Sequence, residues 1–428
     1  MDESDVLGEI LLRLDLEDVN VVKQTSKKYS KMVEDIEKDE EYWRKKLSDY
    51  LGFEVFDRRE RSWSDMYIKA FAVEQDFYEI IKLNYPEIIN GFIKEGFDPS
   101  KEDNLALQMA AERNHYEIVK ILLEDPRVSP KIEDEELEPY KPLADAAKYG
   151  HIETVKLLVE DGRSDPEDAI YWAAANGQLE IVKLLLPISS DDDLDGSFAT
   201  ASGSGRVSLV KFLLTVERID PGANNNAAVE EASGGGHDEV VKLLLADPRV
   251  DPSDNNNKSI RVASIHGHDE VVKLLLADPR VDPTARNNEA VRIASINGRG
   301  NVVKLLLKDG RADPSVDDNY IFIMACRNNH LNVVKLLLKD QRVDPGAQDN
   351  QAIISAAKAG HESIVQLLLK ESLSDKIDPT AQNNKALREA FSRKVLSIAR
   401  LLLNDPRVIK SLDVEEMLKY QKQISETY

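Results

Sequence analysis

The sequence is poor in cysteine and in long apolar runs, and both absences restrict what the protein can be. Cys326 is the single cysteine among 428 residues, which excludes an internal disulfide and a zinc site built on several thiolates. Nowhere do 18 apolar residues follow one another, so we expect no membrane-spanning helix. The start, MDESDVLGEI, lacks the basic residues and unbroken apolar stretch of a secretory signal. We therefore predict a soluble intracellular protein of the cytoplasm or nucleus.

Basic residues are also in deficit. Lys and Arg number 56 against 78 Asp and Glu, which gives a net charge of −22. An acidic surface repels the phosphate backbone of nucleic acids, so nucleic acid is not an expected partner, whereas a basic protein is. Apolar residues make up 42% of the chain, enough to bury a large core.

What the sequence does contain is a repeat. The segment VVKLLL recurs every 31 residues, with IVQLLL as its last copy, at Lys242, Lys273, Lys304, Lys335 and Gln366. Weaker copies lie around Lys120, Lys156, Lys183, Lys211 and Arg400, and a degenerate eleventh copy lies near residues 88–99. A fixed period of this length is typical of a solenoid in which each unit stacks on its neighbours.

One unit shows the expected local structure. Asn257 precedes a short apolar-faced helix, and we predict that its side chain caps the helix start. Gly267 is expected to end that helix in the left-handed conformation. A second helix follows with Lys273 facing solvent, and ADPRVDP ends it because its two prolines cannot continue a helix. Two short helices per unit predict an all-α fold.

This pattern of a short helix, a Gly-His turn, VVKLLL and an extended finger resembles the ankyrin repeat over residues 76–410. The resemblance implies an ankyrin-type helical solenoid of about ten to eleven units, with residues 411–428 as a C-terminal capping helix. The usual Thr-Pro-Leu-His opening is replaced by forms such as Lys258-Ser259-Ile260-Arg261. The Asn-rich fingers resemble those of ankyrin-repeat proteins of giant DNA viruses, and a viral origin would place the protein in the host cytoplasm.

Residues 1–50 do not follow the repeat. EILLRLD, LEDVNVVKQTSKKYSKMV and YWRKKL resemble the three helical stretches of an F-box, and residues 51–75 are expected to be a helical linker. The resemblance implies contact with the Skp-type adaptor of a cullin ubiquitin ligase through Leu7, Ile10, Leu11, Leu14, Val19 and Trp43. The alternative interpretation is a plain helical cap, which a solenoid also needs.

Residues that vary between units on an exposed face are candidates for binding a target. The finger tips differ at 253–256, 284–287, 315–318 and 346–349. One position of the first helix, predicted to point outward along the concave side, holds Tyr171, Arg261, Arg292, Ile323, Ile354 and Arg388. Aromatic and arginine side chains carry more than their share of interface energy, so this stripe is the predicted target-binding surface.

Catalytic and metal chemistry find little support. Six histidines recur at the turn between the helices of a unit, where the family's histidines hold the loop through backbone hydrogen bonds. Asp191, Asp193, Asp195 and Gly196 match the opening of a calcium loop, but Ser202 stands where the bidentate Glu should be. Cys326 replaces a small residue of a first helix and is expected to be buried. We expect no enzyme activity, no metal and no cofactor.

The leading hypothesis is therefore a monomeric protein-interaction protein. The F-box-like segment would engage a cullin ligase, and the repeats would bind the protein to be ubiquitinated. The alternative is an ankyrin-repeat scaffold or decoy that sequesters a host protein without any link to a ubiquitin ligase.

Overall fold

The computed structural model describes residues 77–94, 96–130 and 141–425, and all secondary structure in these ranges is helical. The chain divides into two compact units, residues 1–197 and 198–428, and each contains several of the repeats. The predicted all-α solenoid is confirmed, because helices follow in pairs of a first and a second helix joined by a tight turn. None of the described helices is both long and apolar enough to cross a membrane.

The first unit holds four helix pairs in its described residues. The first helices are α6 (Phe77–Leu83), α8 (Lys101–Glu112), α10 (Pro142–Tyr149) and α12 (Glu167–Asn176). The second helices are α7 (Pro86–Lys94), α9 (Tyr116–Leu123), α11 (Ile152–Asp161) and α13 (Leu179–Leu185). The degenerate repeat copy near residues 88–99 corresponds to α7.

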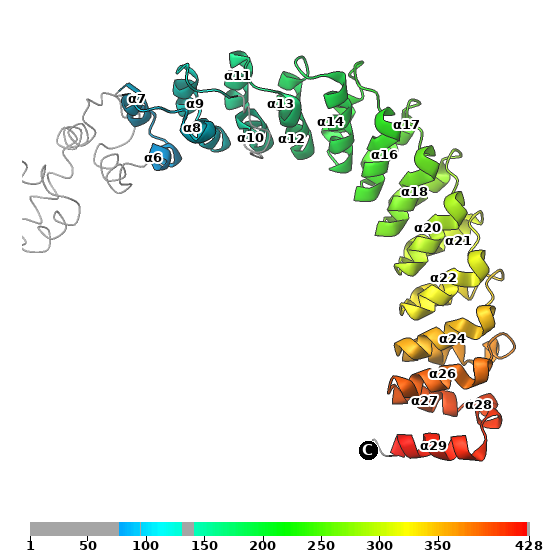
Figure 1. The fold of residues 1–428 in the computed structure, drawn as a ribbon. Coiled ribbons are helices and arrows are strands. Elements are labelled where there is room, and N and C mark those ends of the chain that lie inside the picture. The colour runs from blue at the N-terminus through cyan, green and yellow to red at the C-terminus, as the bar shows by residue number, and fades with distance from the viewer. Residues whose placement is uncertain (1–76, 95, 131–140, 426–428) are drawn as a thin grey trace, which may run out of the picture. The chain divides into compact units, whose positions relative to one another are not determined.

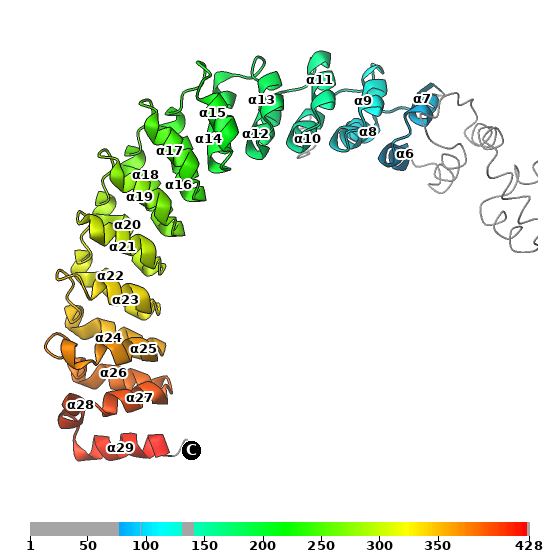
Figure 2. The same cartoon turned by 180° about the vertical axis from the view of Figure 1, so that it is seen from behind.

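The second unit begins inside α14 (Asp191–Gly203) and continues the same pairing. Figure 1 shows its first helices side by side, and Figure 2 shows its second helices from behind. After α14 the first helices are α16 (Ala223–Gly235), α18 (Asp254–His266), α20 (Ala285–Ile296), α22 (Val316–Arg327), α24 (Ala347–Ala359) and α26 (Ala381–Ser392). The second helices are α15 (Val207–Leu213), α17 (Asp238–Ala246), α19 (Asp269–Ala277), α21 (Gly300–Asp309), α23 (Leu331–Leu337), α25 (Glu362–Leu368) and α27 (Leu396–Leu403).

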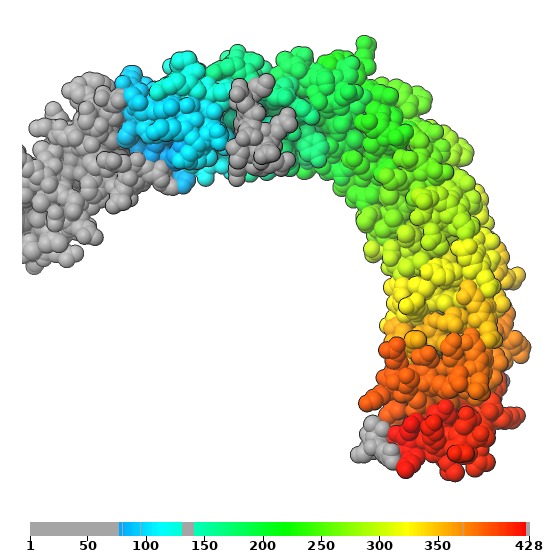
Figure 3. Space-filling view, in the orientation of Figure 1, coloured from blue at the N-terminus to red at the C-terminus, as the bar shows by residue number. Residues whose placement is uncertain are grey.

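Three further elements complete the second unit. A 3-10 turn, η1 (Glu371–Leu373), follows α25, and the helices α28 (Pro406–Ser411) and α29 (Val414–Ser425) follow α27. The ring of Tyr420 on α29 stacks on that of Phe391 on α26, with centroids 4.5 Å apart. In Figure 3 the colours of the second unit succeed one another in chain order, so each helix pair contacts its neighbours in sequence.

The second helices bury the apolar face that the sequence predicts. On α19, Val271, Val272 and Leu275 are fully enclosed, while Lys273 is exposed and pairs with Glu270 at 2.8 Å. Each such burial stabilises the fold by about 1.5–3 kcal/mol. A helix of nine residues would not persist alone in water, so the stack supplies the stability of each unit.

The turn after each first helix also follows the sequence. Gly267 has φ +85°, the left-handed conformation that glycine adopts at little cost, and it ends α18 as predicted. Histidines then form hydrogen bonds to the preceding repeat: His237 Nε2 lies 2.9 Å from the carbonyl oxygen of Gly203, and His268 Nε2 lies 2.9 Å from that of Gly234. His151, His330 and His361 make the same bond at 2.8–2.9 Å, which confirms their predicted structural role.

The predicted capping role of the recurrent asparagine is wrong. Asn255, Asn256 and Asn257 all have positive φ, between +52° and +58°, and form one left-handed turn before the regular part of α18. The Asn257 side-chain oxygen accepts a hydrogen bond from the backbone N–H of Asp282, at 2.7 Å, in the next unit. Asparagine suits this place because it tolerates the left-handed conformation better than most residues and carries an acceptor. The asparagine therefore joins two successive repeats.

We call these three-residue segments left-handed turns. They occupy residues 102–104, 224–226, 255–257, 286–288, 317–319, 348–350 and 382–384. In the second unit the bond from the last residue to the next finger recurs from Asn226, Asn288, Asn319 and Asn350, at 2.6–2.8 Å.

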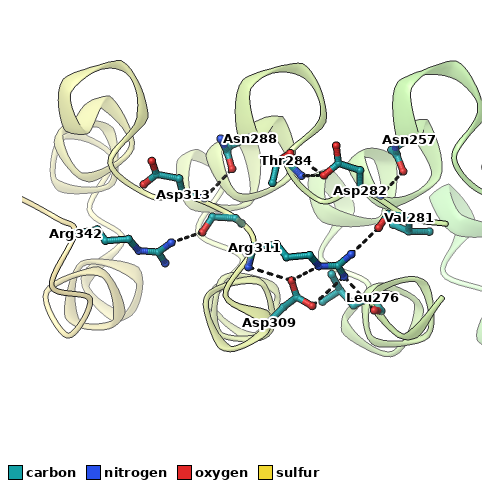
Figure 4. Close-up of polar contacts among 11 residues, drawn as sticks. Asn257, Leu276, Val281, Asp282, Thr284, Asn288, Asp309, Arg311, Asp313 and Arg342 are labelled. Carbon is teal, nitrogen blue, oxygen red and sulfur yellow. Dashed lines mark hydrogen bonds and ion pairs between the residues drawn. The ribbon is translucent and has the colours of Figure 1, made fainter. Parts of the chain in front are cut away.

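Arginines of the finger, the extended segment after each second helix, make a second polar link between successive repeats, which we call the arginine step (Figure 4). Arg311 donates to both carboxylate oxygens of Asp309, to the carbonyl of Val281 at 2.8 Å and to the carbonyl of Leu276 at 3.2 Å. The guanidinium thereby holds its own finger and the preceding one together. Steps of this kind are formed by Asp125–Arg127, Asp161–Arg163, Asp247–Arg249, Asp278–Arg280, Asp309–Arg311, Asp340–Arg342 and Asp405–Arg407.

The two remaining sequence candidates for chemistry lie within first helices. Asp191 and Asp193 are in the first turn of α14, where Ser190 and Asp193 exchange reciprocal hydrogen bonds of 3.0 and 3.1 Å that fix the helix start. Asp195, Gly196 and Ser202 continue that helix, so the segment is a first helix and not a loop wrapped around a cation. Cys326 is fully buried on α22, as expected, and burial raises the pKa of its thiol far above the usual range.

Candidate protein-binding surface

In the second unit, the surface varies most at the tips of the left-handed turns. In the four turns from 255–257 to 348–350 the first two residues are exposed, and their side chains differ from turn to turn while the backbone repeats. These turn pairs are Asn255–Asn256, Arg286–Asn287, Asp317–Asp318 and Gln348–Asp349. Their charge changes from neutral to basic to strongly acidic along the unit, so they present a row of different side chains on one fixed scaffold.

Neighbouring turn pairs are linked by hydrogen bonds. Asn287 Nδ2 donates to Asp317 Oδ1 at 3.0 Å, and Gln348 Nε2 donates to the carbonyl of Asp318 at 3.0 Å. These bonds restrict the side chains before a partner arrives, which lowers the entropy lost on binding. Of the finger tips predicted from the sequence as variable, the last two residues are exposed and partly ordered, whereas the first two are less exposed and Ala347 is buried.

The predicted first-helix stripe divides into exposed and buried members. Tyr171 and Arg388 are exposed, and Arg292 is partly exposed. Arg261, Ile323 and Ile354 retain only 9%, 5% and 2% of their surface. The prediction that all six point outward is wrong for these three residues, and a partner cannot contact Ile323 or Ile354 without displacing their neighbours.

The environment of Arg261 gives the physical reason. Its Nη1 donates to the carbonyl of Asn255 at 3.2 Å, and its Nε donates to Glu289 of the next first helix at 2.6 Å. This helical position therefore lies between the left-handed turn of its own repeat and the first helix of the next repeat. Ile323 and Ile354 occupy the equivalent place, four residues after the last asparagine of their turns, and fill it with apolar side chains.

The first unit carries a cluster of exposed aromatic side chains on two successive first helices. Tyr149 on α10 is 49% exposed, and Tyr171 and Trp172 on α12 are 46% and 39% exposed. Lys148 Nζ lies 5.2 Å from the centroid of the Tyr149 ring and 4.8 Å from that of Trp172. We refer to Lys148, Tyr149, Tyr171 and Trp172 as the aromatic cluster. Single exposed aromatics are common, but a cluster this close-set is typical of a binding surface.

A carboxyl group beside the cluster has an unusual pKa. Burial raises the pKa of Asp145 to about 6, with a further increase from the charge of Glu112 and an opposing effect from Lys148. Asp145 is on α10 with Lys148 and Tyr149, so the local charge of this helix depends on pH just below neutrality.

Sequence reasoning found only Tyr171 of the aromatic cluster. Tyr149 comes one place before the turn glycine, and Trp172 stands at a position that holds Glu231, Val262 or Ser355 in other repeats. Aromatic residues at these two places could have indicated the surface. What the sequence could not show is that Lys148 contacts rings from two successive repeats, Tyr149 on α10 and Trp172 on α12.

The predicted adaptor-binding residues Leu7, Ile10, Leu11, Leu14, Val19 and Trp43 all lie outside the described residues. The same holds for the F-box-like segment 1–50 and the linker 51–75.

Comparison with known families identifies the repeat. The model described as ankyrin repeats (3 copies) matches seven overlapping segments: 77–168, 107–197, 143–228, 197–287, 227–318, 260–349 and 321–412. Together they extend without a gap from residue 77 to residue 412, well over half of the chain. No curated protein matches the chain.

Proposed function

The chain belongs to the ankyrin-repeat family, a family of protein-interaction modules, and on that premise we propose that it recruits a target protein to an SCF-type cullin ubiquitin ligase. In this proposal the repeats hold the target, and the F-box-like segment 1–50 engages the Skp-type adaptor. The protein acts as a monomer and catalyses no reaction itself, and α29 caps the stack. The observation that carries target binding is the aromatic cluster.

The aromatic cluster supports target binding on energetic grounds. Tyr and Trp bury much surface at little loss of conformational entropy, and both are enriched among the residues that dominate interface energy. Lys148 already holds the rings of Tyr149 and Trp172 in place, so a partner would meet a surface that is largely pre-organised. We expect Trp172→Ala to weaken target binding by at least about tenfold, which is the effect of a typical hot-spot residue.

The target-binding part is tested by proximity labelling in the host cell followed by affinity measurement with the captured protein. Tyr320→Ala is the matched control, because Tyr320 on α22 is similarly exposed, at 38%, but lies in the second unit. Equal affinity of the wild type and of Trp172→Ala for every captured protein would exclude the aromatic cluster as the target site.

The ligase part is tested separately by co-purification with a Skp-type adaptor. Leu11→Asp introduces a charge at one of the apolar residues that the F-box resemblance assigns to adaptor contact and should abolish the association, whereas Arg13→Asp, at a residue outside that set, should not. If the folded wild type does not bind the adaptor, or if Leu11→Asp retains full binding, the chain is a scaffold or decoy that sequesters its target.

A further inference from the structure

The row of arginine steps in the second unit loses both its aspartate and its arginine at one place, whereas before α16 Val216 replaces only the aspartate and Arg218 remains. By the pattern of the neighbouring fingers, a step is due where Ile377-Asp378-Pro379 repeats Val343-Asp344-Pro345. The backbone keeps the repeat there, because the N–H of Asp378 donates to Asn350 at 2.7 Å as the N–H of Asp344 donates to Asn319 at 2.8 Å. The side chains do not, since Ser374 stands for the aspartate and Lys376 for the arginine.

The interruption leaves a carbonyl group without its arginine. The carbonyls of Val281 and Ala312 accept from Arg311 and Arg342 at 2.8 and 2.9 Å, and the equivalent carbonyl is that of Val343. No arginine of the described residues donates to it. Lys376 is exposed, and the finger that carries it is three residues longer than its neighbours.

A cleft opens at the same place. It has a volume of about 600 Å³, and its walls include Val343, Ser374, Asp375, Lys376 and Ile377. Arg342 and Arg407 also line it, but each is engaged by its own aspartate at 2.7 and 2.8 Å. Asp375 is exposed at the cleft, one residue from where the aspartate of an intact step would be.

We propose that this cleft binds the side chain of an arginine from a partner protein, which completes the interrupted step. The cleft offers the two kinds of group that hold arginine elsewhere in this chain, a finger carbonyl and a carboxylate, and Figure 4 shows their arrangement in an intact step. Guanidinium fits better than ammonium, because a planar fork of five donors reaches both groups at once, whereas the chain's own Lys376 does not. The net charge of −22 favours the approach of a basic partner.

The proposal is tested on the full chain with methyl-labelled valine and isoleucine, titrated with N-acetyl-arginine methylamide. The methyl resonances of Val343 and Ile377 should shift and saturate. N-acetyl-lysine methylamide should bind at least about threefold more weakly, because it lacks the fork. Asp375→Asn should weaken arginine binding about threefold or more, since a charge-assisted bond is lost. Asp349→Asn removes the same charge from an exposed turn pair outside the cleft and should leave binding unchanged.

Absence of a saturable shift at Val343 and Ile377 would overturn the proposal. So would equal binding of the arginine and lysine compounds, or equal effects of Asp375→Asn and Asp349→Asn. Neither F-box function nor the aromatic cluster enters this experiment, so its result is independent of the proposed ligase link.

Discussion

Three buried serines occupy one equivalent position in successive first helices, a position that accepts several small side chains. Ser233, Ser264 and Ser295 are fully buried on successive first helices, and their hydroxyl groups have no hydrogen-bond partner. The equivalent position holds the buried Cys326 and, in α24, the buried Ala357. A buried unpaired hydroxyl costs free energy, so the alanine units are better satisfied at this position than the serine units.

Ser264→Ala should therefore stabilise the protein. We expect the free energy of unfolding to rise by about 1 kcal/mol, because an unpaired polar group is removed without leaving a large cavity. Urea unfolding of wild type and variant measures the difference. Ser253→Ala is the contrasting control, because the Ser253 hydroxyl donates to Asp251 at 2.7 Å, and this change should not stabilise. A loss of stability in Ser264→Ala would show that its hydroxyl is paired.

The arginine steps make a second prediction at the residue scale. The hydrogen bond from Arg280 lowers the pKa of Asp278, and burial opposes this only in part. The pair thus stabilises the fold fully above the ordinary aspartate pKa, and this stability is lost as the pH falls through the lowered folded value. Arg280→Lys should cost about 2 kcal/mol at pH 7, since lysine cannot bridge the carboxylate and two carbonyls together.

Urea unfolding at pH 7 and at pH 3 measures that cost. It should shrink at pH 3, below the ordinary aspartate pKa, because part of the stability that the lowered pKa of Asp278 supplies is already lost there in the wild type. Arg286→Lys provides the control, because Arg286 is an exposed residue with one ion pair at 3.5 Å, and it should change stability little at either pH. A cost that is the same at both pH values would contradict the electrostatic account.

At the scale of the element, the left-handed turn is the least ordinary part of the unit. Three successive non-glycine residues with positive φ are costly for most side chains, and asparagine and aspartate reduce that cost. The hydrogen bond between the turn and the next finger offsets part of that cost. The turn is therefore a strained segment of backbone that stacking on the following repeat stabilises.

Asn257→Ala should remove both the tolerance and the bond. We expect a loss of about 2–3 kcal/mol, from the left-handed alanine and from the backbone amide of Asp282 that loses its acceptor. Hydrogen exchange should show faster exchange of the Asp282 amide and its neighbours. Asn256→Gly, at an exposed left-handed position, should cost far less. Equal protection of Asp282 in wild type and Asn257→Ala would show that the side-chain bond is absent.

The elements differ in how far the sequence predicts them. The apolar spacing of Val271, Val272 and Leu275 and the place of Gly267 depend only on nearby residues, so the helices and their ends could be predicted. The bonds of Asn257 and Arg311 join residues 25 to 35 positions apart and become evident only when units are stacked. For the same reason, an isolated helix would leave Ile323 exposed, whereas in the stack it retains only 5% of its surface.

At the scale of the whole molecule, stability should be distributed unit by unit. Each arginine step joins only adjacent fingers, so a broken step should loosen its two neighbours and leave distant units unchanged. We expect Arg311→Ala to speed hydrogen exchange in α19 to α22 and to leave α16 as in the wild type. The interrupted step before α26 predicts that α26 to α29 exchange fastest in the wild-type second unit. Uniform exchange across this unit would contradict both expectations.

The near-identical spacing of the left-handed turns in residues 224–350 also bears on how such a chain can change in length. Each link between repeats joins residues whose separation is set by the 31-residue period. Removing residues 254–284, which are one full period, joins Ser253 to Ala285 and leaves every remaining turn, step and histidine opposite its partner. Genetic gain or loss of whole units would thus give folded proteins at once, each with a different order of turn pairs. Copy number becomes a means of changing what the surface recognises without redesigning how it folds.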